Sequence, residues 1–166
     1  MNIVLCGMMG AGKTSVGKKL EEMTGRPCVD TDDMIVEKHG RITDIFEKYG
    51  EPYFRDLETG VAEEISKSDN LIVSTGGGMV MRPQNAEFLK RNGKIVFLRA
   101  RLETLLKRVE GDDSRPLLKG GAEERLRELI AVRTPVYEAA ADFVVDTDGM
   151  SLEDVAREIL SLTGQT

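Results

Sequence analysis

The stretch NIVLCGMMGAGKT, residues 2–14, decides the fold of this chain. A strand-like run leads directly into the pattern G-x-x-x-x-G-K-[ST], and a helical pattern begins at its end. Successive backbone N–H groups and a helix start then point at one spot, which favours a phosphate over a plain glycine-rich turn. Lys13 is expected to reach the β- and γ-phosphates of a nucleoside triphosphate, and Thr14 to ligate Mg²⁺. The residues expected to bind the nucleotide here are Gly10, Ala11, Gly12, Lys13, Thr14 and Ser15.

Four more strand-like runs follow along the chain, at residues 28–31, 71–75, 94–100 and 143–147. They are continuously apolar, as expected when helices cover both faces of a parallel sheet. Helical patterns lie between them, and Gly25 and Gly50 are typical helix ends. The alternation predicts an α/β fold of three layers, with a five-stranded parallel sheet flanked by helices. The predicted helices cover residues 13–25, 42–50, 52–67, 84–91, 102–110, 122–133 and 151–162.

Length and charge restrict the class of protein. A chain of 166 residues predicts one domain, 1–166. The net charge of −6 and the absence of a Lys/Arg run argue against a nucleic-acid partner. No apolar run approaches the roughly 20 residues of a membrane span, and the N-terminus lacks signal-peptide features, so a cytoplasmic location is expected. Cys6 and Cys28 are interpreted as buried apolar residues, not as a disulfide or a metal site.

Two acidic residues follow the second strand, in the stretch VDTDDM. Asp30 and Asp32 lie at the carboxyl edge of the predicted sheet, where ligands bind in open α/β folds. One carboxylate there can hold Mg²⁺ through water while the other orients a hydroxyl and takes its proton. The alternative is that an aspartate merely caps the next helix, and Asp33 is the residue expected to do so.

A run of three glycines and two arginines could bind an acceptor substrate that carries a negative charge. The stretch STGGG puts Gly76, Gly77 and Gly78 after the third strand, where each costs backbone entropy. A hinge is one explanation; close approach of a ligand to the backbone is the other. Arg55 and Arg133 come from separate helical stretches, and either alone is weak evidence because arginine is usually solvated.

The motifs together resemble the shikimate kinase family. GMMGAGKT, DTD, FR-x-x-E, GGG, RPLL and R-x-P-x-Y occur in this order between Ile3 and about Asp148. The resemblance implies a P-loop kinase fold, a helical acceptor-binding segment at about 32–60 and a lid at about 110–122. It also implies ATP and shikimate as substrates, with Mg²⁺ as cofactor, and a monomeric enzyme.

The resemblance also implies a role for each motif residue. Asp32 would contact the acceptor hydroxyls and act as the base, while Asp30 would join Thr14 around Mg²⁺. Arg55 and Arg133 would clamp the shikimate carboxylate, helped by backbone amides of the glycine loop. The remaining implied roles are Glu58 holding Arg55, Phe46 and Phe54 forming an apolar wall under the ring, Arg108 lying near adenine, and Arg115 of the lid acting with Lys13 in catalysis.

The expected reaction converts ATP and shikimate to ADP and shikimate 3-phosphate, on the route to chorismate and the aromatic amino acids. A gluconate or related polyol-acid kinase of the same fold is the first alternative. A non-catalytic NTP-binding switch module is the second, although it would leave Arg55, Arg133 and the glycine loop without a role.

Overall fold

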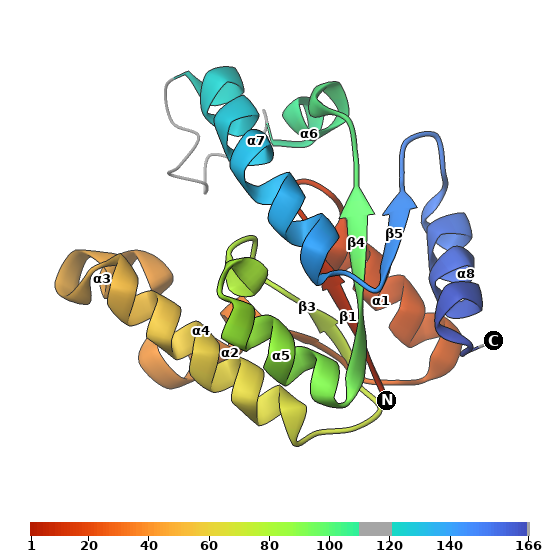
Figure 1. Cartoon of the computed structure of the whole chain (residues 1–166), viewed down its shortest axis with the longest axis horizontal. Coiled ribbons are helices and arrows are strands. Elements are labelled where there is room, and N and C mark those ends of the chain that lie inside the picture. The colour runs from red at the N-terminus through yellow and green to blue at the C-terminus, as the bar shows by residue number, and fades with distance from the viewer. Residues whose placement is uncertain (110–120, 166) are drawn as a thin grey trace.

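A computed structural model describes residues 1–109 and 121–165 of the chain (Figure 1). Five parallel strands form one sheet in the order β2-β3-β1-β4-β5. The strands are β1 (Asn2–Cys6), β2 (Cys28–Asp30), β3 (Ile72–Ser74), β4 (Gly93–Arg99) and β5 (Phe143–Asp146). The predicted α/β fold with a five-stranded parallel sheet is therefore confirmed.

Helices cover both faces of the sheet and make three layers (Figure 1). Helices α1 and α8 pack together on one face, while α5 and α7 contact β4 on the other and α4 packs on α5. The helical elements are α1 (Lys13–Thr24), α2 (Thr31–His39), α3 (Ile42–Tyr49), α4 (Glu51–Ser66), the 3₁₀ turn η1 (Met79–Met81), α5 (Pro83–Arg91), α6 (Leu102–Val109), α7 (Ala122–Ala140) and α8 (Leu152–Thr163). In the part of the chain that the structure describes, no helix combines the length and the apolar character needed to cross a membrane.

The central strand explains why the opening stretch decides the fold. Four consecutive β1 residues, Ile3 to Cys6, are fully buried between the two helical layers. Burial also raises the pKa of the Cys6 thiol to about 12, so this cysteine is a neutral core residue, as predicted. Cys28 is only half-buried, at the start of the short strand β2.

Most boundaries lie within one residue of the prediction, and two of the differences have a clear physical cause. The second strand stops at Asp30 instead of residue 31, because Thr31 already belongs to α2. The helix expected to end at 133 continues through Pro135 to Ala140. Proline costs a helix about 3 kcal/mol in its interior, but the helix keeps Tyr137 fully buried against Phe97, with ring centroids 5.0 Å apart. Burial of this large ring offsets the local penalty.

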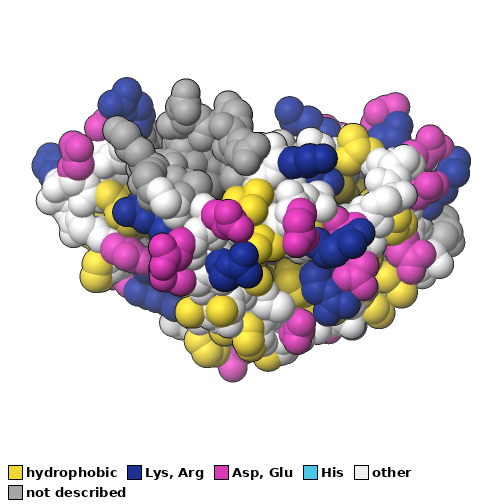
Figure 2. Space-filling model, turned by 90° about the horizontal axis from the view of Figure 1, so that it is seen from above, with side chains coloured by type: hydrophobic (Ala, Val, Ile, Leu, Met, Phe, Trp, Pro, Cys, Tyr) yellow, Lys and Arg dark blue, Asp and Glu magenta, His cyan; other side chains and the backbone are white. Residues whose placement is uncertain are grey.

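The topology places three loops at one edge of the sheet. The chain moves from β1 outward to β2, returns to β3, and then crosses β1 to reach β4. All five strands run in the same direction, so the segments after β1, β2 and β3 meet at the upper edge in Figure 1. Ligands bind in α/β sheets at this kind of switch in strand order. Figure 2 looks down from that side, where Lys and Arg side chains lie among Asp and Glu side chains.

Candidate active site

The loop after β1 leads directly into helix α1. Gly12 has a positive φ of 91° and sits at the N-terminus of α1, a conformation that favours glycine. Lys13 folds back over the loop, where its Nζ donates hydrogen bonds to the carbonyls of Gly7, at 2.5 Å, and Met8, at 3.0 Å. The ammonium group is therefore held where phosphate oxygens would approach the loop.

Helix α6 adds a second cation to this loop. Arg108 Nη1 donates a hydrogen bond to the Gly10 carbonyl at 2.9 Å. The resemblance implies a position near adenine, and the structure places this guanidinium against the phosphate loop. Arg115 and residues 110–120 of the predicted lid lie outside the described residues.

Asp30 ends β2 and caps the next helix. Its Oδ1 accepts hydrogen bonds from the backbone N–H groups of Asp32, at 2.8 Å, and Asp33, at 3.1 Å. The prediction that Asp33 is the cap is therefore wrong. The helix starts one residue after Asp30, whose extended backbone is the conformation of an N-cap residue, and Asp33 lies inside the first turn.

The Asp30 carboxylate suits a hard cation by its chemistry. Burial raises its pKa, and hydrogen bonds from the backbone fix its orientation. Among the described residues, no group of three or more His, Cys, Asp or Glu side chains is arranged to hold a metal ion. A Mg²⁺ ion carried by phosphates needs only one or two protein oxygens besides water, and a carboxylate with the Thr14 hydroxyl supplies that donor set.

Asp32 is the more perturbed of the two acids. Burial, followed by the negative charges of Asp30 and Glu58, raises its pKa to about 6, while the charge of Lys13 acts in the opposite direction. A carboxylate with this pKa is a better proton acceptor near neutral pH than an ordinary aspartate. The side chain also lies directly over Gly76, in the loop after β3.

The raised pKa predicts that Asp32 lowers folding stability at neutral pH. A carboxyl that titrates at about 6 when folded and near 3.8 when unfolded loses stability as pH rises through this window. Asp32→Asn should therefore be more stable than the unmodified protein at pH 7.5, by about 1–3 kcal/mol. The gain should vanish near pH 4. Urea unfolding at both pH values measures it, with the exposed Asp33→Asn as control; an equal difference at both pH values would contradict the prediction.

Arg55 on α4 is held by carboxylates on two sides. Its Nη1 donates to Glu58 Oε1 at 2.8 Å, so the expected ion pair is present, and Glu58 is only 1% exposed. Its Nη2 also pairs with the exposed Glu51 at 3.1 Å. The guanidinium lies 5.4 Å from the ring of Phe54, and that ring packs against Phe46 at 5.0 Å. A planar cation is thereby oriented above an aromatic surface.

Arg133 extends from helix α7 to the glycine loop after β3. It lies on α7, more than 100 positions after the phosphate loop, and is only 9% exposed. Four residues later on the same helix face, the Tyr137 hydroxyl donates a hydrogen bond to the Gly77 carbonyl at 2.5 Å. The loop and the arginine are therefore connected through one helix turn.

Each of the three consecutive glycines makes room for one site residue. A Cβ on Gly76 would lie 2.7 Å from Asp32 Oδ1, and one on Gly77 would lie 2.7 Å from Arg133 Nη1. A Cβ on Gly78 would lie 2.8 Å from Arg55 Cζ. All three distances are shorter than real Cβ contacts, so any larger residue would displace the side chain concerned. The triple glycine is therefore explained by the packing of three functional side chains against one loop, besides any approach of substrate.

Gly78→Ala should impair the site without unfolding the protein. The clash involves the end of a flexible side chain, so Arg55 can swing away at small cost to stability, but it loses its position. An acceptor carboxylate that needs this guanidinium should bind roughly 10-fold more weakly or worse. The control is Gly60→Ala on α4, where nothing lies within 4 Å of the added Cβ. Calorimetric affinities and melting temperatures of both variants test this; equal acceptor affinities would refute it.

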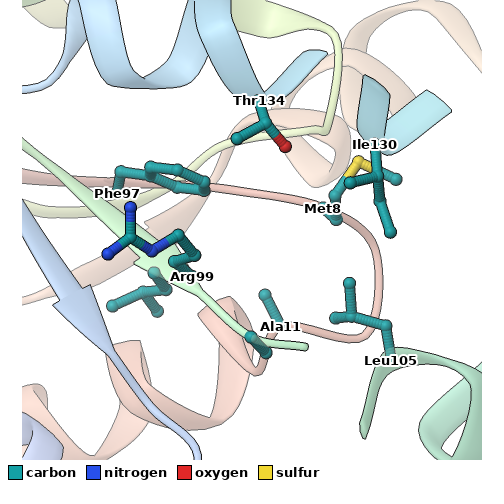
Figure 3. A pocket seen from close by; sticks show the side chains of 9 residues that line it. Met8, Ala11, Phe97, Arg99, Leu105, Ile130 and Thr134 are labelled. Atoms are coloured by element: carbon teal, nitrogen blue, oxygen red, sulfur yellow. The ribbon is translucent and has the colours of Figure 1, made fainter. Parts of the chain in front are cut away.

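A small cavity nearby is distinct from this arrangement (Figure 3). It lies between the phosphate loop, β4, α6 and α7, and its volume of about 20 Å³ is room for one water molecule. The lining is mainly apolar, and includes Met8, Phe97, Leu105 and Ile130. A nucleotide or a cyclic acid cannot fit there, so the open edge above the strands is the candidate site.

Some residues of the site were not expected from the sequence. Thr31 accepts a hydrogen bond from the Gly76 N–H at 3.0 Å and links the start of α2 to the glycine loop. Glu51 is another, and Tyr137 belongs to the R-x-P-x-Y motif but was given no role of its own. The spacing of four residues between Glu51 and Arg55, and between Arg133 and Tyr137, is the signal that could have found both pairs.

Comparisons with known proteins agree on one family. The sequence pattern of the family described as "Shikimate kinase" matches residues 9–163. Shikimate kinases of Caldicellulosiruptor bescii and Symbiobacterium thermophilum are 44% and 46% identical, over 97% and 96% of this chain and 94% of each relative. A solved structure of shikimate kinase from Acinetobacter baumannii in complex with shikimate has a TM-score of 0.91 and 42% identity, covering 97% of this chain and 91% of that one.

Proposed function

Because the chain belongs to the shikimate kinase family, we propose that it transfers the γ-phosphoryl group of ATP to the 3-hydroxyl of shikimate. It is an ATP-dependent phosphotransferase with an alcohol acceptor, and the product shikimate 3-phosphate leads to chorismate and the aromatic amino acids. The observation that carries the proposal is the glycine loop after β3. Asp32, Arg133 and Arg55 pack on its three consecutive residues, beside a phosphate loop.

The acceptor would bind between these side chains. Arg55 and Arg133 offer planar forks that fit the shikimate carboxylate, and the backbone amides of Gly76 to Gly78 add donors. Phe46 and Phe54 would pack against the ring. Asp32 would accept the proton of the attacking hydroxyl, for which a raised pKa is favourable.

The nucleotide would occupy the loop from Gly10 to Ser15. Lys13 and Arg108 would neutralise phosphate charge, and Arg115 is proposed to do the same from the predicted lid at 110–122. Thr14 and Asp30 would hold Mg²⁺, which would neutralise phosphate charge. The chain's own contribution is to position the two substrates and to stabilise charge.

The remaining proposals concern the setting of the enzyme. We propose a monomer built as a single domain, with residues 32–60 as the acceptor-binding segment. ATP as co-substrate supports a cytoplasmic location. We expect no nucleic-acid partner, because the net charge is −6.

An ADP-release assay tests the proposed function directly. Shikimate, quinate, gluconate and nucleoside monophosphates are offered in turn with ATP and Mg²⁺. Shikimate should give the highest kcat/KM, and product analysis should locate the phosphate on the 3-hydroxyl. Failure to phosphorylate shikimate would overturn the proposal. Turnover of gluconate alone would support a polyol-acid kinase, and turnover of none would support a nucleotide switch.

A further inference from the structure

The side chain of Tyr137 is buried at the junction of three parts of the site. Its exposed fraction is 0%, and burial raises the pKa of its phenol to about 12. The phenol therefore stays protonated at any pH at which the enzyme works, and it cannot serve as an acid or a base near neutrality. A buried hydroxyl without partners would be costly, so its hydrogen bonds indicate what it is for.

The hydroxyl is hydrogen-bonded to the glycine loop and lies beside the guanidinium of Arg133. Its O–H donates to the Gly77 carbonyl at 2.5 Å. The Arg133 guanidinium lies close enough that its positive charge lowers the pKa of the phenol, against the larger effect of burial. The same guanidinium lies so close to Gly77 that a Cβ there would come within 2.7 Å of Nη1. Arginine, tyrosine and loop thus form one connected unit.

The ring is held so that the hydroxyl has little freedom. Phe97 on β4 packs against it at a centroid distance of 5.0 Å, with ring planes at 37°. On another side, the sulfur of Met8 from the phosphate loop lies 3.9 Å from the hydroxyl oxygen. Figure 3 shows Met8 and Phe97 on the walls of the same small cavity. A hydroxyl fixed in this way can fix its partners in turn.

We infer that Tyr137 is a positioning residue, whose hydroxyl holds the Arg133 guanidinium and the Gly77 peptide in the orientation that receives the carboxylate of the acceptor. The inference rests on the proposed function of this site. Tyr137 itself need not touch either substrate. Its removal should therefore act on the acceptor carboxylate through Arg133, and leave nucleotide binding almost unchanged.

Tyr137→Phe tests this, because it removes only the hydroxyl and keeps the ring packed on Phe97. The expected result is an increase in the KM and Kd for shikimate on the order of 10-fold, with the KM for ATP changed less than about 2-fold. The matched control is Tyr53→Phe on the exposed surface of α4, which should leave both values unchanged. Melting temperatures show whether both variants are folded.

A double-mutant cycle separates positioning from general support of the fold. Arg133→Lys should weaken shikimate binding clearly in the unmodified protein and much less in the Tyr137→Phe background, because the oriented guanidinium is already lost. Additive effects, or a lower melting temperature with an unchanged KM for shikimate, would overturn the inference. If the unmodified protein does not phosphorylate shikimate at all, the proposed function fails instead, so the two failures are distinguishable.

Discussion

Asp32→Asn is expected to lower kcat for shikimate phosphorylation at least about 10²-fold, the usual scale for loss of a general base. The amide keeps the shape of the side chain over Gly76 but cannot accept the proton of the attacking hydroxyl. The nucleotide loop is a separate segment, so the affinity for ATP should be nearly unchanged. Steady-state kinetics and calorimetric titration with a nucleotide measure the two effects.

The control for this variant is Asp33→Asn, one residue further along α2 and exposed. It should retain near-normal turnover, since Asp33 lies inside the first helical turn and is not the cap. The Asp32 variant should combine lost activity with higher stability at pH 7.5. Near-normal turnover of Asp32→Asn would show that another group takes the proton.

Removal of either arginine of the clamp should produce the second large effect. Each charged hydrogen-bonding contact contributes about 1.5–3 kcal/mol, which is roughly 10- to 150-fold in affinity. Arg55→Ala and Arg133→Ala should weaken shikimate binding by this factor with little change in ATP binding. Arg133→Lys should already weaken it, since a lysine keeps the charge but loses the planar fork. Arg127→Ala, exposed on the same helix, is the control.

The ligand can be varied to test the same contact. Shikimate methyl ester keeps the ring and hydroxyls but presents no charge to the two guanidinium groups. It should be a poor substrate of the unmodified enzyme, and its handicap should shrink in the arginine variants because the contact is already gone. Equal kcat/KM for ester and acid would assign both arginines to a structural network with Glu58 and Glu51 instead.

The fold could be predicted almost completely from the sequence. Continuous apolar runs gave the five strands, and the order of strand, phosphate loop and helix gave the class of fold. The errors lay at the ends of elements, because a contact between residues far apart in the sequence can decide where a helix ends. Helix α7 passes through Pro135 because Tyr137 packs on Phe97, which is 40 positions earlier in the chain and invisible to local patterns.

The sequence predicted which residues form the site, but not which of them contact one another. Motifs indicated Asp32, Arg55 and Arg133 individually, yet no sequence pattern pairs each with its own glycine. The cap was assigned to Asp33 because several aspartates follow one another and all can cap; only the backbone conformation of Asp30 distinguishes them. Glu51 was missed because an exposed glutamate at a helix start is usually explained by the helix dipole alone.

The pairing of three glycines with three side chains limits how this enzyme can change. Random substitution at positions 76–78 should return glycine almost alone among active clones, whereas Gly60 should accept many residues. A search for variants that phosphorylate a different acid should therefore leave this loop intact. Phe46, which is 36% exposed and packs on the ring of Phe54, is a better place to alter the choice of acceptor.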